Sequence, residues 1–492
     1  MRSLGALRRL LTRWPRECGI AAAVLWSCAY FFQGGGWNQS AHFATTYSLI
    51  EDGTFLLDRY RASSGDLARI GEHVVSNKAV GTALAAIPGY LVARVLTAAV
   101  DNPGDQIIVR AYLTTVLSAG VALAALAVLL YRLLLRRLAA RDAALVALAT
   151  ALATPLFPNS TMLTSNPFAA LTALAAYAVL SKPGPPSRSR LFVAGVLAAA
   201  PACFEYHLAI LAAPFGLYAL WLCRPRPLRA LAMVGGALVV LLVPSAHHFV
   251  VYGHPLSVGY ASLTNPTGAR EAAIGFMGFD GFSIARLYEL TFGTSRGLFF
   301  LSPFLVAAVP GFARLWRVSR AEAMVTGGCA ALILGAIASL VYWHSGSSVG
   351  SRYALSCVVF LAFGVGAIVA HHRRWVGLGI AVAFAFMLLA TSVTAIPPTP
   401  SPRPPYQNVI GWYHQAFSIG KLANYQSPIL LDQVAGDGHP SLPFAFNLGL
   451  LAGLPGRWSL LPFLAGLWAI CRWLWRTTSE PGGHAHGATL SS

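Results

Sequence analysis

The chain has 492 residues, of which 56% are hydrophobic and only 11% are charged. A soluble domain carries about 25% charged residues, so this composition excludes an ordinary soluble protein. Long runs rich in Ala, Leu and Val recur along the chain without the period-two alternation of a β-barrel, and they predict an all-α polytopic membrane protein.

The net charge of +18 comes from arginines gathered in short polar breaks between the apolar runs. Placing these breaks on one side of a membrane puts 22 of the 35 basic residues there with four acidic ones, whereas the other side holds 13 of each. This asymmetry follows the positive-inside rule, so the basic excess indicates topology and not nucleic-acid binding. The breaks are residues 1–16, 132–141, 182–190, 224–229, 314–320, 371–374 and 472–476.

Twelve crossings, with both termini inside, place every basic break on the inner side. A crossing helix needs about 20 apolar residues. The pair within 191–222 is short, but the basic segments on either side of it demand an even number of crossings. The expected crossings are 18–33, 109–131, 143–157, 167–181, two within 191–222, 230–251, 298–313, 323–343, 353–370, 375–396 and 458–475.

The apolar stretch between Lys78 and Asp101 is interrupted by Pro88-Gly89, and we interpret it as an interfacial or re-entrant helix. Reading it as a crossing would move the arginines at 132–141 to the outside. We therefore expect one transmembrane domain, 1–476, with outer loops at 33–108, 252–297 and 397–457. The Gly/His/Ser-rich tail, 477–492, is expected to be a disordered inner segment.

The first outer loop carries the residues best suited to chemistry. Asp58 and Asp66 are carboxylates that could deprotonate a hydroxyl beside a low-dielectric wall, and Lys78 could hold an anionic headgroup at the mouth of an apolar helix. The alternative interpretation makes Asp58 and Asp66 solvated loop charges beside Arg59 and Arg69.

Other ionisable residues are expected on the same side. Glu205 lies at an outer turn, where a structural or supporting role is favoured over that of a base. Arg296 and Arg352 each begin an inward helix, and together with Lys78 they favour an anionic ligand over simple snorkelling. His42 has no metal-ligand spacing and is interpreted as a polar interface residue. The seven cysteines form no CxxC motif and are interpreted as buried hydrophobes, so no metal or cofactor is predicted.

Several stretches carry a resemblance to a known family. They are the first apolar run, W-N-Q-S-A-H-F-A-T-T-Y-S-L-I-E-D-G-T-F-L-L-D, H-V-V-S-N-K-A-V-G-T-A-L-A-A-I-P-G-Y, S-R-G-L-F-F-L-S-P-F and Y-W-H-S-G-S-S-V-G-S-R-Y. The chain resembles the GT-C superfamily of polyprenyl-phosphate-sugar glycosyltransferases, and most of all the bacterial relatives of protein O-mannosyltransferases and of the lipid A aminoarabinose transferase. The resemblance implies a GT-C-like fold with about 12 transmembrane helices and juxtamembrane helices in the first outer loop.

The same resemblance matches Lys78 to the family's phosphate-contacting lysine. Relatives carry an Asp, often Asp-Glu, just after the first helix, where this chain has Asn38 and Gln39. These amides cannot act as a base, so either Asp58 or Asp66 takes that role or the protein binds without catalysing. We prefer Asp58, because it closes the apolar segment T-F-L-L-D. Asn38 is interpreted as a helix cap or an acceptor-positioning amide.

The leading hypothesis is an inverting glycosyltransferase of the bacterial inner membrane. It would move a hexosyl or pentosyl group from a polyprenyl-phosphate donor to a periplasmic glycan, lipid or protein acceptor, with Asp58 or Asp66 as base and Lys78, Arg296 and Arg352 on the phosphate. The alternatives are a transporter or flippase of a lipid-linked sugar and a non-catalytic protein of envelope assembly. A cavity open to the outer face alone would favour the enzyme.

Overall fold

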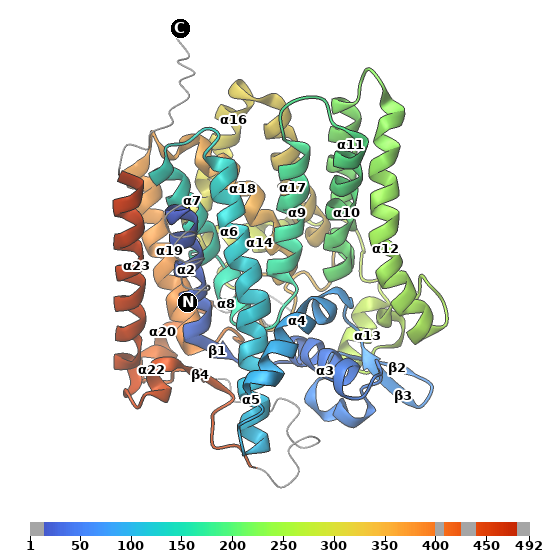
Figure 1. Ribbon diagram of the computed structural model, residues 1–492, viewed down its shortest axis with the longest axis vertical. Coiled ribbons are helices and arrows are strands. Elements are labelled where there is room, and N and C mark those ends of the chain that lie inside the picture. Colours follow the sequence, from blue (N-terminus) through green and yellow to red (C-terminus); the bar gives the residue numbers. More distant parts are fainter. Residues whose placement is uncertain (1–13, 399–407, 425–438, 480–492) are drawn as a thin grey trace, which may run out of the picture.

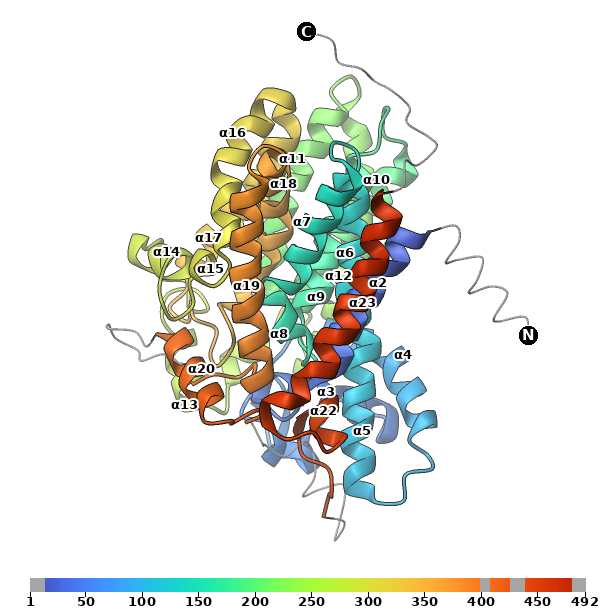
Figure 2. The ribbon, with the colours of Figure 1, turned by 90° about the vertical axis from the view of Figure 1, so that its left-hand side faces the viewer.

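The computed structural model describes residues 14–398, 408–424 and 439–479 as a bundle of helices with smaller elements collected at one end (Figures 1 and 2). We call this end, which holds residues 33–108, the loop end. The other end carries residues 132–141, 314–320 and 371–374, and we call it the arginine end (Figure 1). Most of the first basic break, most of the predicted tail and parts of the loop 397–457 lie outside the described residues.

Each of the twelve predicted crossings coincides with a helix or a chain of short helices. The elements are α2 (Pro15–Tyr30), α5–η2–α6 (Pro103–Leu134), α7 (Ala140–Leu152), α9 (Asn166–Leu180), α10 (Arg188–Phe204), η3–α11 (Tyr206–Leu222), η4–α12 (Pro227–Tyr252), α15–η6–α16 (Leu298–Val318), α17 (Arg320–Ala338), η7–α18 (Arg352–Val369), α19 (Arg373–Val393) and η8–α23 (Gly456–Ser479). Five helices in the described part of the chain are long and apolar enough to cross a membrane by length and composition: Pro103–Leu134, Pro227–Tyr252, Arg320–Ala338, Arg352–Val369 and Arg373–Val393. The count of twelve crossings therefore stays a prediction.

Glycines let the helices approach closely where they cross. A Cβ placed on Gly195 of α10 would lie 1.9 Å from the carbonyl oxygen of Met233 on α12. Reciprocally, one on Gly236 would lie 2.0 Å from the carbonyl oxygen of Phe192. Small residues at helix crossings permit the tight van der Waals packing that replaces the hydrophobic effect inside a membrane.

Ion pairs join neighbouring helices at the arginine end. Glu17 pairs with Arg132 at 3.2 Å, Asp142 pairs with Arg373 at 2.8 Å, and Glu322 pairs with Arg137 at 2.5 Å. The Nε of Arg16 donates to the carbonyl of Thr477, so the first and last described helices begin and end at the same end of the bundle. Within the described residues, the acidic side chains at this end thus pair with arginines of the basic breaks.

The loop end departs from the all-α prediction through two small antiparallel sheets. β1 (Phe31–Gln33) pairs with β4 (Ala445–Asn447), and β2 (Leu67–Ile70) pairs with β3 (His73–Ser76). Gly71, in the turn between β2 and β3, has a φ of +59°, a conformation that a residue without a Cβ adopts at low cost. Strands this short carry too little periodicity to be recognised within an apolar membrane sequence.

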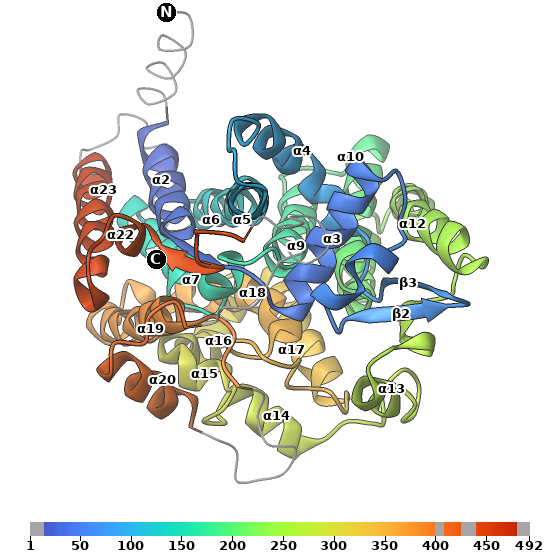
Figure 3. The ribbon, with the colours of Figure 1, turned by 90° about the horizontal axis from the view of Figure 1, so that it is seen from below.

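The stretch interpreted as an interfacial or re-entrant helix is α4 (Gly81–Leu96), which lies at the loop end and continues through Pro88-Gly89. A Cβ on Gly89 would lie 2.5 Å from the Oγ of Ser118, so this glycine allows α4 to pack tightly against η2 (Val116–Gly120). Together α3 (Trp37–Glu51), α4, β2 and β3 form a layer across the loop end, which Figure 3 shows from below.

Candidate functional site

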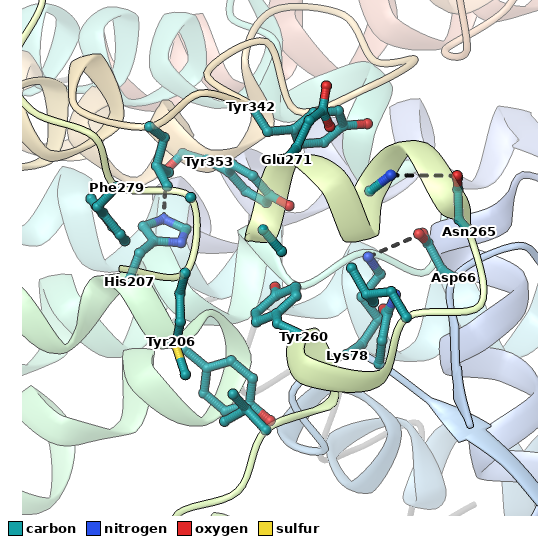
Figure 4. A pocket seen from close by; sticks show the side chains of 18 of the residues that line it. Asp66, Lys78, Tyr206, His207, Tyr260, Asn265, Glu271, Phe279, Tyr342 and Tyr353 are labelled. Carbon is teal, nitrogen blue, oxygen red and sulfur yellow. Dashed lines mark hydrogen bonds and ion pairs between the residues drawn. The ribbon is translucent and has the colours of Figure 1, made fainter. Parts of the chain in front are cut away.

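A cavity of about 530 Å³ lies at the loop end (Figure 4). Its walls come from the β2–β3 region, η3, the segment between α12 and α14 (Ile284–Thr291), the residues after α17, and the start of η7. Aromatic side chains dominate the lining, and four charged side chains interrupt it. The aromatic residues are Trp37, Tyr206, Tyr260, Phe276, Phe279, Tyr342 and Tyr353, and the charged ones are Asp66, Lys78, Glu271 and Arg352.

Asp66 and Lys78 form an ion pair in this cavity, with Oδ2 and Nζ 3.1 Å apart. The β2–β3 hairpin sets their positions, because the amide of Asn77 donates to the carbonyl of Asp66. Burial alone would raise the pKa of Asp66, but the charges of Lys78 and Arg352 outweigh it and hold the pKa below its usual value. Burial lowers the pKa of Lys78, and the attraction of Asp66 offsets this only in part.

Arg352 brings a second cation to the cavity wall. Its backbone amide donates to the Oγ of Ser345 at 2.8 Å, and its carbonyl accepts from the Nδ2 of Asn166 at 2.7 Å. The side chain is 9% exposed, forms no ion pair with a described carboxylate, and its Nε has no hydrogen-bond partner among the described residues. A buried guanidinium with free donors is suited to receive an anionic group.

Glu205 lies beside this site without lining the cavity. Its carboxylate accepts a hydrogen bond from the Oγ of Ser165 and lies 3.9 Å from the Nδ1 of His207. His207 does line the cavity, and its Nε2 lies 3.0 Å from the carbonyl of Tyr353. Glu205 therefore contacts the cavity residue His207 without lining the cavity itself.

Asn38, Gln39 and His42 are buried on α3, and none of them lines the cavity. Gly36 is the N-cap of this helix, so the prediction of Asn38 as a cap is wrong: the helix starts one residue before it. The Oδ1 of Asn38 and the Nε2 of Gln39 have no hydrogen-bond partner in the described chain. Burial, together with the charges of Lys78 and Arg352, lowers the pKa of His42 to about 3, so this imidazole is neutral.

Asp58 lies away from the cavity. One carboxylate oxygen lies 2.7 Å from the Nδ1 of His73, and the other accepts from the amide of Val74 at 2.9 Å. Burial alone would raise the pKa of Asp58, but the hydrogen bonds from His73 and Val74 lower it. The structure therefore ties Asp58 to the β2–β3 hairpin and brings only Asp66 of the two predicted carboxylates into the cavity.

Arg296 is also absent from the cavity lining. Its side chain is 1% exposed, and its two Nη atoms donate to the carbonyls of Ser295, Gly346 and Pro398. Burial lowers its pKa to about 10. These contacts hold the loop that leads to Arg352. Arg296 therefore binds backbone carbonyls, whereas the sequence predicted that it would contact the phosphate directly.

Sequence reasoning missed Glu271. It lies on α13 (Pro266–Ala272), a seven-residue helix that Asn265 caps by accepting from the amides of Thr267 and Gly268. The sequence N-P-T-G-A-R-E carries this cap signal, but the cap does not reveal which wall of a cavity the helix will form. No group of three or more His, Cys, Asp or Glu side chains able to hold a metal ion is present in residues 14–398, 408–424 and 439–479.

Comparison with solved structures adds a distant likeness to this geometry. No family model matches the chain, and no curated protein matches it in sequence. Among solved structures, the chain is similar to ArnT from Cupriavidus metallidurans bound to undecaprenyl phosphate, with 14% sequence identity and a TM-score of 0.42 over 93% of this chain and 74% of that one. The site must therefore be interpreted from its own residues.

Proposed function

We propose that the protein is a membrane glycosyltransferase of the GT-C type, which moves a sugar from a polyprenyl-phosphate donor to a cell-envelope acceptor. The observation that carries this proposal is the meeting of Lys78 and Arg352 in one aromatic-walled cavity at the loop end. Phosphate esters need fixed cations, and sugar rings pack on aromatic side chains. The resemblance of the sequence to polyprenyl-phosphate-sugar transferases supports the same chemistry.

The cation pair would act mainly on the leaving group. As the bond between the anomeric carbon and the phosphate oxygen breaks, negative charge grows on the lipid phosphate, and Lys78 and Arg352 are placed to stabilise it. The ion pair with Asp66 would orient the Lys78 ammonium, whose stem is otherwise flexible. Attack by an acceptor hydroxyl on the opposite face of the sugar would invert the anomeric centre.

The position of the cavity supports a transferase over a transporter. Its described lining comes from elements at the loop end, opposite the arginine breaks that we assign to the cytoplasmic side. A transporter needs a site that can also face the arginine end. The proposal therefore places the reaction on the periplasmic side of the bacterial inner membrane, with both termini cytoplasmic.

The test is transfer by purified protein in detergent with a panel of polyprenyl-phosphate sugars, followed as release of free polyprenyl phosphate. We expect release with at least one donor and its loss in Lys78→Ala and Arg352→Gln variants. Binding of polyprenyl phosphate without turnover of any donor would instead favour a flippase or an assembly protein. Absence of both binding and turnover would refute the proposed ligand class.

A further inference from the structure

The cavity holds a second carboxylate, Glu271, whose surroundings differ from those of Asp66. Asp66 is bound to Lys78, whereas the carboxylate of Glu271 forms no hydrogen bond or ion pair with any residue in the described parts of the chain. Figure 4 shows Glu271 beside Tyr342, apart from the Asp66–Lys78 pair, with Tyr260 and Tyr353 also in the cavity. The two acids therefore occupy different parts of one site.

The two carboxylates also differ in basicity. The charges of Lys78 and Arg352 lower the pKa of Asp66, which makes it a weak base, and Lys78 occupies one of its oxygens. Burial raises the pKa of Glu271, which makes this carboxylate the more basic one while leaving its lone pairs free. A carboxylate without a protein partner is suited to accept a hydrogen bond from a substrate hydroxyl.

The volume and the charge of the cavity are consistent with different roles for Asp66 and Glu271. A volume of about 530 Å³ is within the range of small-molecule sites, so the cavity can hold a sugar between the Asp66–Lys78 pair and Glu271. The two cations and two carboxylates of the lining balance each other. Adding the phosphate of a donor beside Lys78 and Arg352 engages both cations, which leaves Glu271 as the carboxylate free for the acceptor.

On the basis of the proposed function, we propose that Glu271 is the catalytic residue that removes the proton from the acceptor hydroxyl. The acceptor O–H bond breaks, its proton moves to the Glu271 carboxylate, and the acceptor oxygen bonds to the anomeric carbon. The bond from that carbon to the phosphate oxygen breaks at the same time, and its electron pair leaves with the polyprenyl phosphate. Asp66 keeps its proton-free state throughout and positions Lys78.

The experiment compares Glu271→Gln with Glu289→Gln in the full-length protein. Glu289, on α14, is a matched control because burial also raises its pKa and its Oε2 has no described partner, but it does not line the cavity. Binding of undecaprenyl phosphate and transfer are measured for each variant, together with the pH dependence of kcat/KM. The other charged and titratable groups that line the cavity with Glu271 are Asp66, Lys78, Tyr206, His207, Tyr260, Tyr342, His344, Arg352 and Tyr353.

Glu271→Gln should bind undecaprenyl phosphate as the wild type does and lose transfer by about 10²- to 10⁴-fold, the range of general-base catalysis. The wild-type rate should rise with pH through the pKa of Glu271, and this acidic limb should be missing in the variant. Glu289→Gln should keep both the rate and the limb. Transfer within twofold of wild type in Glu271→Gln, or an acidic limb that persists there and vanishes in Asp66→Asn, would overturn this assignment and leave the proposed function standing. Wild-type protein that transfers no sugar would refute the proposed function itself.

Discussion

The Nζ of Lys78 lies 3.1 Å from the Oδ2 of Asp66, and both side chains line the cavity at the loop end. Asp66 directly precedes β2 and Lys78 is the second residue after β3, so the hairpin brings together two groups twelve positions apart. At neutral pH the lowered pKa of Asp66 keeps it ionised, and the Asp66 charge counteracts part of the lowering of the Lys78 pKa by burial. The ion pair therefore holds the Lys78 ammonium in position in the cavity.

Replacing Lys78 by Ala should weaken the binding of undecaprenyl phosphate about ten- to a hundredfold. A hydrogen bond to a charged group contributes about 1.5–3 kcal/mol, and each 1.4 kcal/mol is a factor of ten. Titration of the purified protein with the lipid measures this change. Lys421→Ala is the matched control, because Lys421 is an exposed lysine that does not line the cavity, and equal weakening in both variants would contradict the assignment.

Substitution of Arg352 by Gln should affect lipid binding, whereas substitution of Arg296 by Gln should affect stability. Arg352→Gln should weaken binding of the lipid phosphate while leaving folding largely intact, because its guanidinium carries no ion pair to a described residue. Arg296→Gln should instead lower thermal stability, since carbonyls of Gly346 and Pro398 lose a buried donor, at a cost of about 1–3 kcal/mol each. Thermal unfolding and lipid titration of the two variants distinguish these roles. Weaker lipid binding in Arg296→Gln together with lower stability in Arg352→Gln would contradict the assignment.

Asp58→Asn should leave transfer within about threefold of wild type. Asp58 is placed outside the cavity, and its partners are His73, Val74 and Arg61. Because its folded-state pKa is lowered, its contribution to stability is present above the ordinary pKa of Asp and is lost as the pH falls through the folded value. Limited proteolysis of the hairpin between neutral and acidic pH checks this, and a loss of transfer as large as that of Lys78→Ala would restore Asp58 to the active site.

Gly236→Ala should destabilise the protein by about 1–3 kcal/mol, because the new Cβ would meet the backbone carbonyl of Phe192 at 2.0 Å. Its neighbour Gly235 is the control: there the nearest atom is a ring carbon of Phe192 at 4.0 Å, so Gly235→Ala should be tolerated. Thermal unfolding in one detergent compares the two. Equal midpoints would show that α10 and α12 are not packed as closely as described.

The topology predicts opposite accessibility for two exposed positions. With the seven native cysteines replaced by Ala, Glu72→Cys should react with a membrane-impermeant thiol reagent from the periplasmic side. Ser189→Cys, in a basic break, should react only after the cytoplasmic side is opened. Labelling of both from the same side would refute the assignment of the two ends.

The positions of the helices could be inferred from sequence because membrane crossings need long apolar runs and arginine breaks mark one side. All twelve expected runs contain helix, and the pair within 191–222 is α10 followed by η3–α11. The continuity of α4 through Pro88 could not be inferred in this way. The close approach of Gly89 to Ser118 could not be inferred either, because these residues are neighbours only in the folded chain.

The sequence by itself determined the membrane class, the sidedness of charge and the presence of Asp66, Lys78 and Arg352 on one face, since each follows from composition or from position next to an apolar run. Only the tertiary structure decided which of these residues share a cavity. The turn at Gly71 brings Asp66 to Lys78, and it places His73 and Val74 against Asp58, outside the cavity. Carbonyls from distant loops engage Arg296. Glu271 enters the site through the placement of α13, more than 190 residues after Lys78. Such contacts between distant segments depend on packing geometry, which local patterns of residue type do not encode.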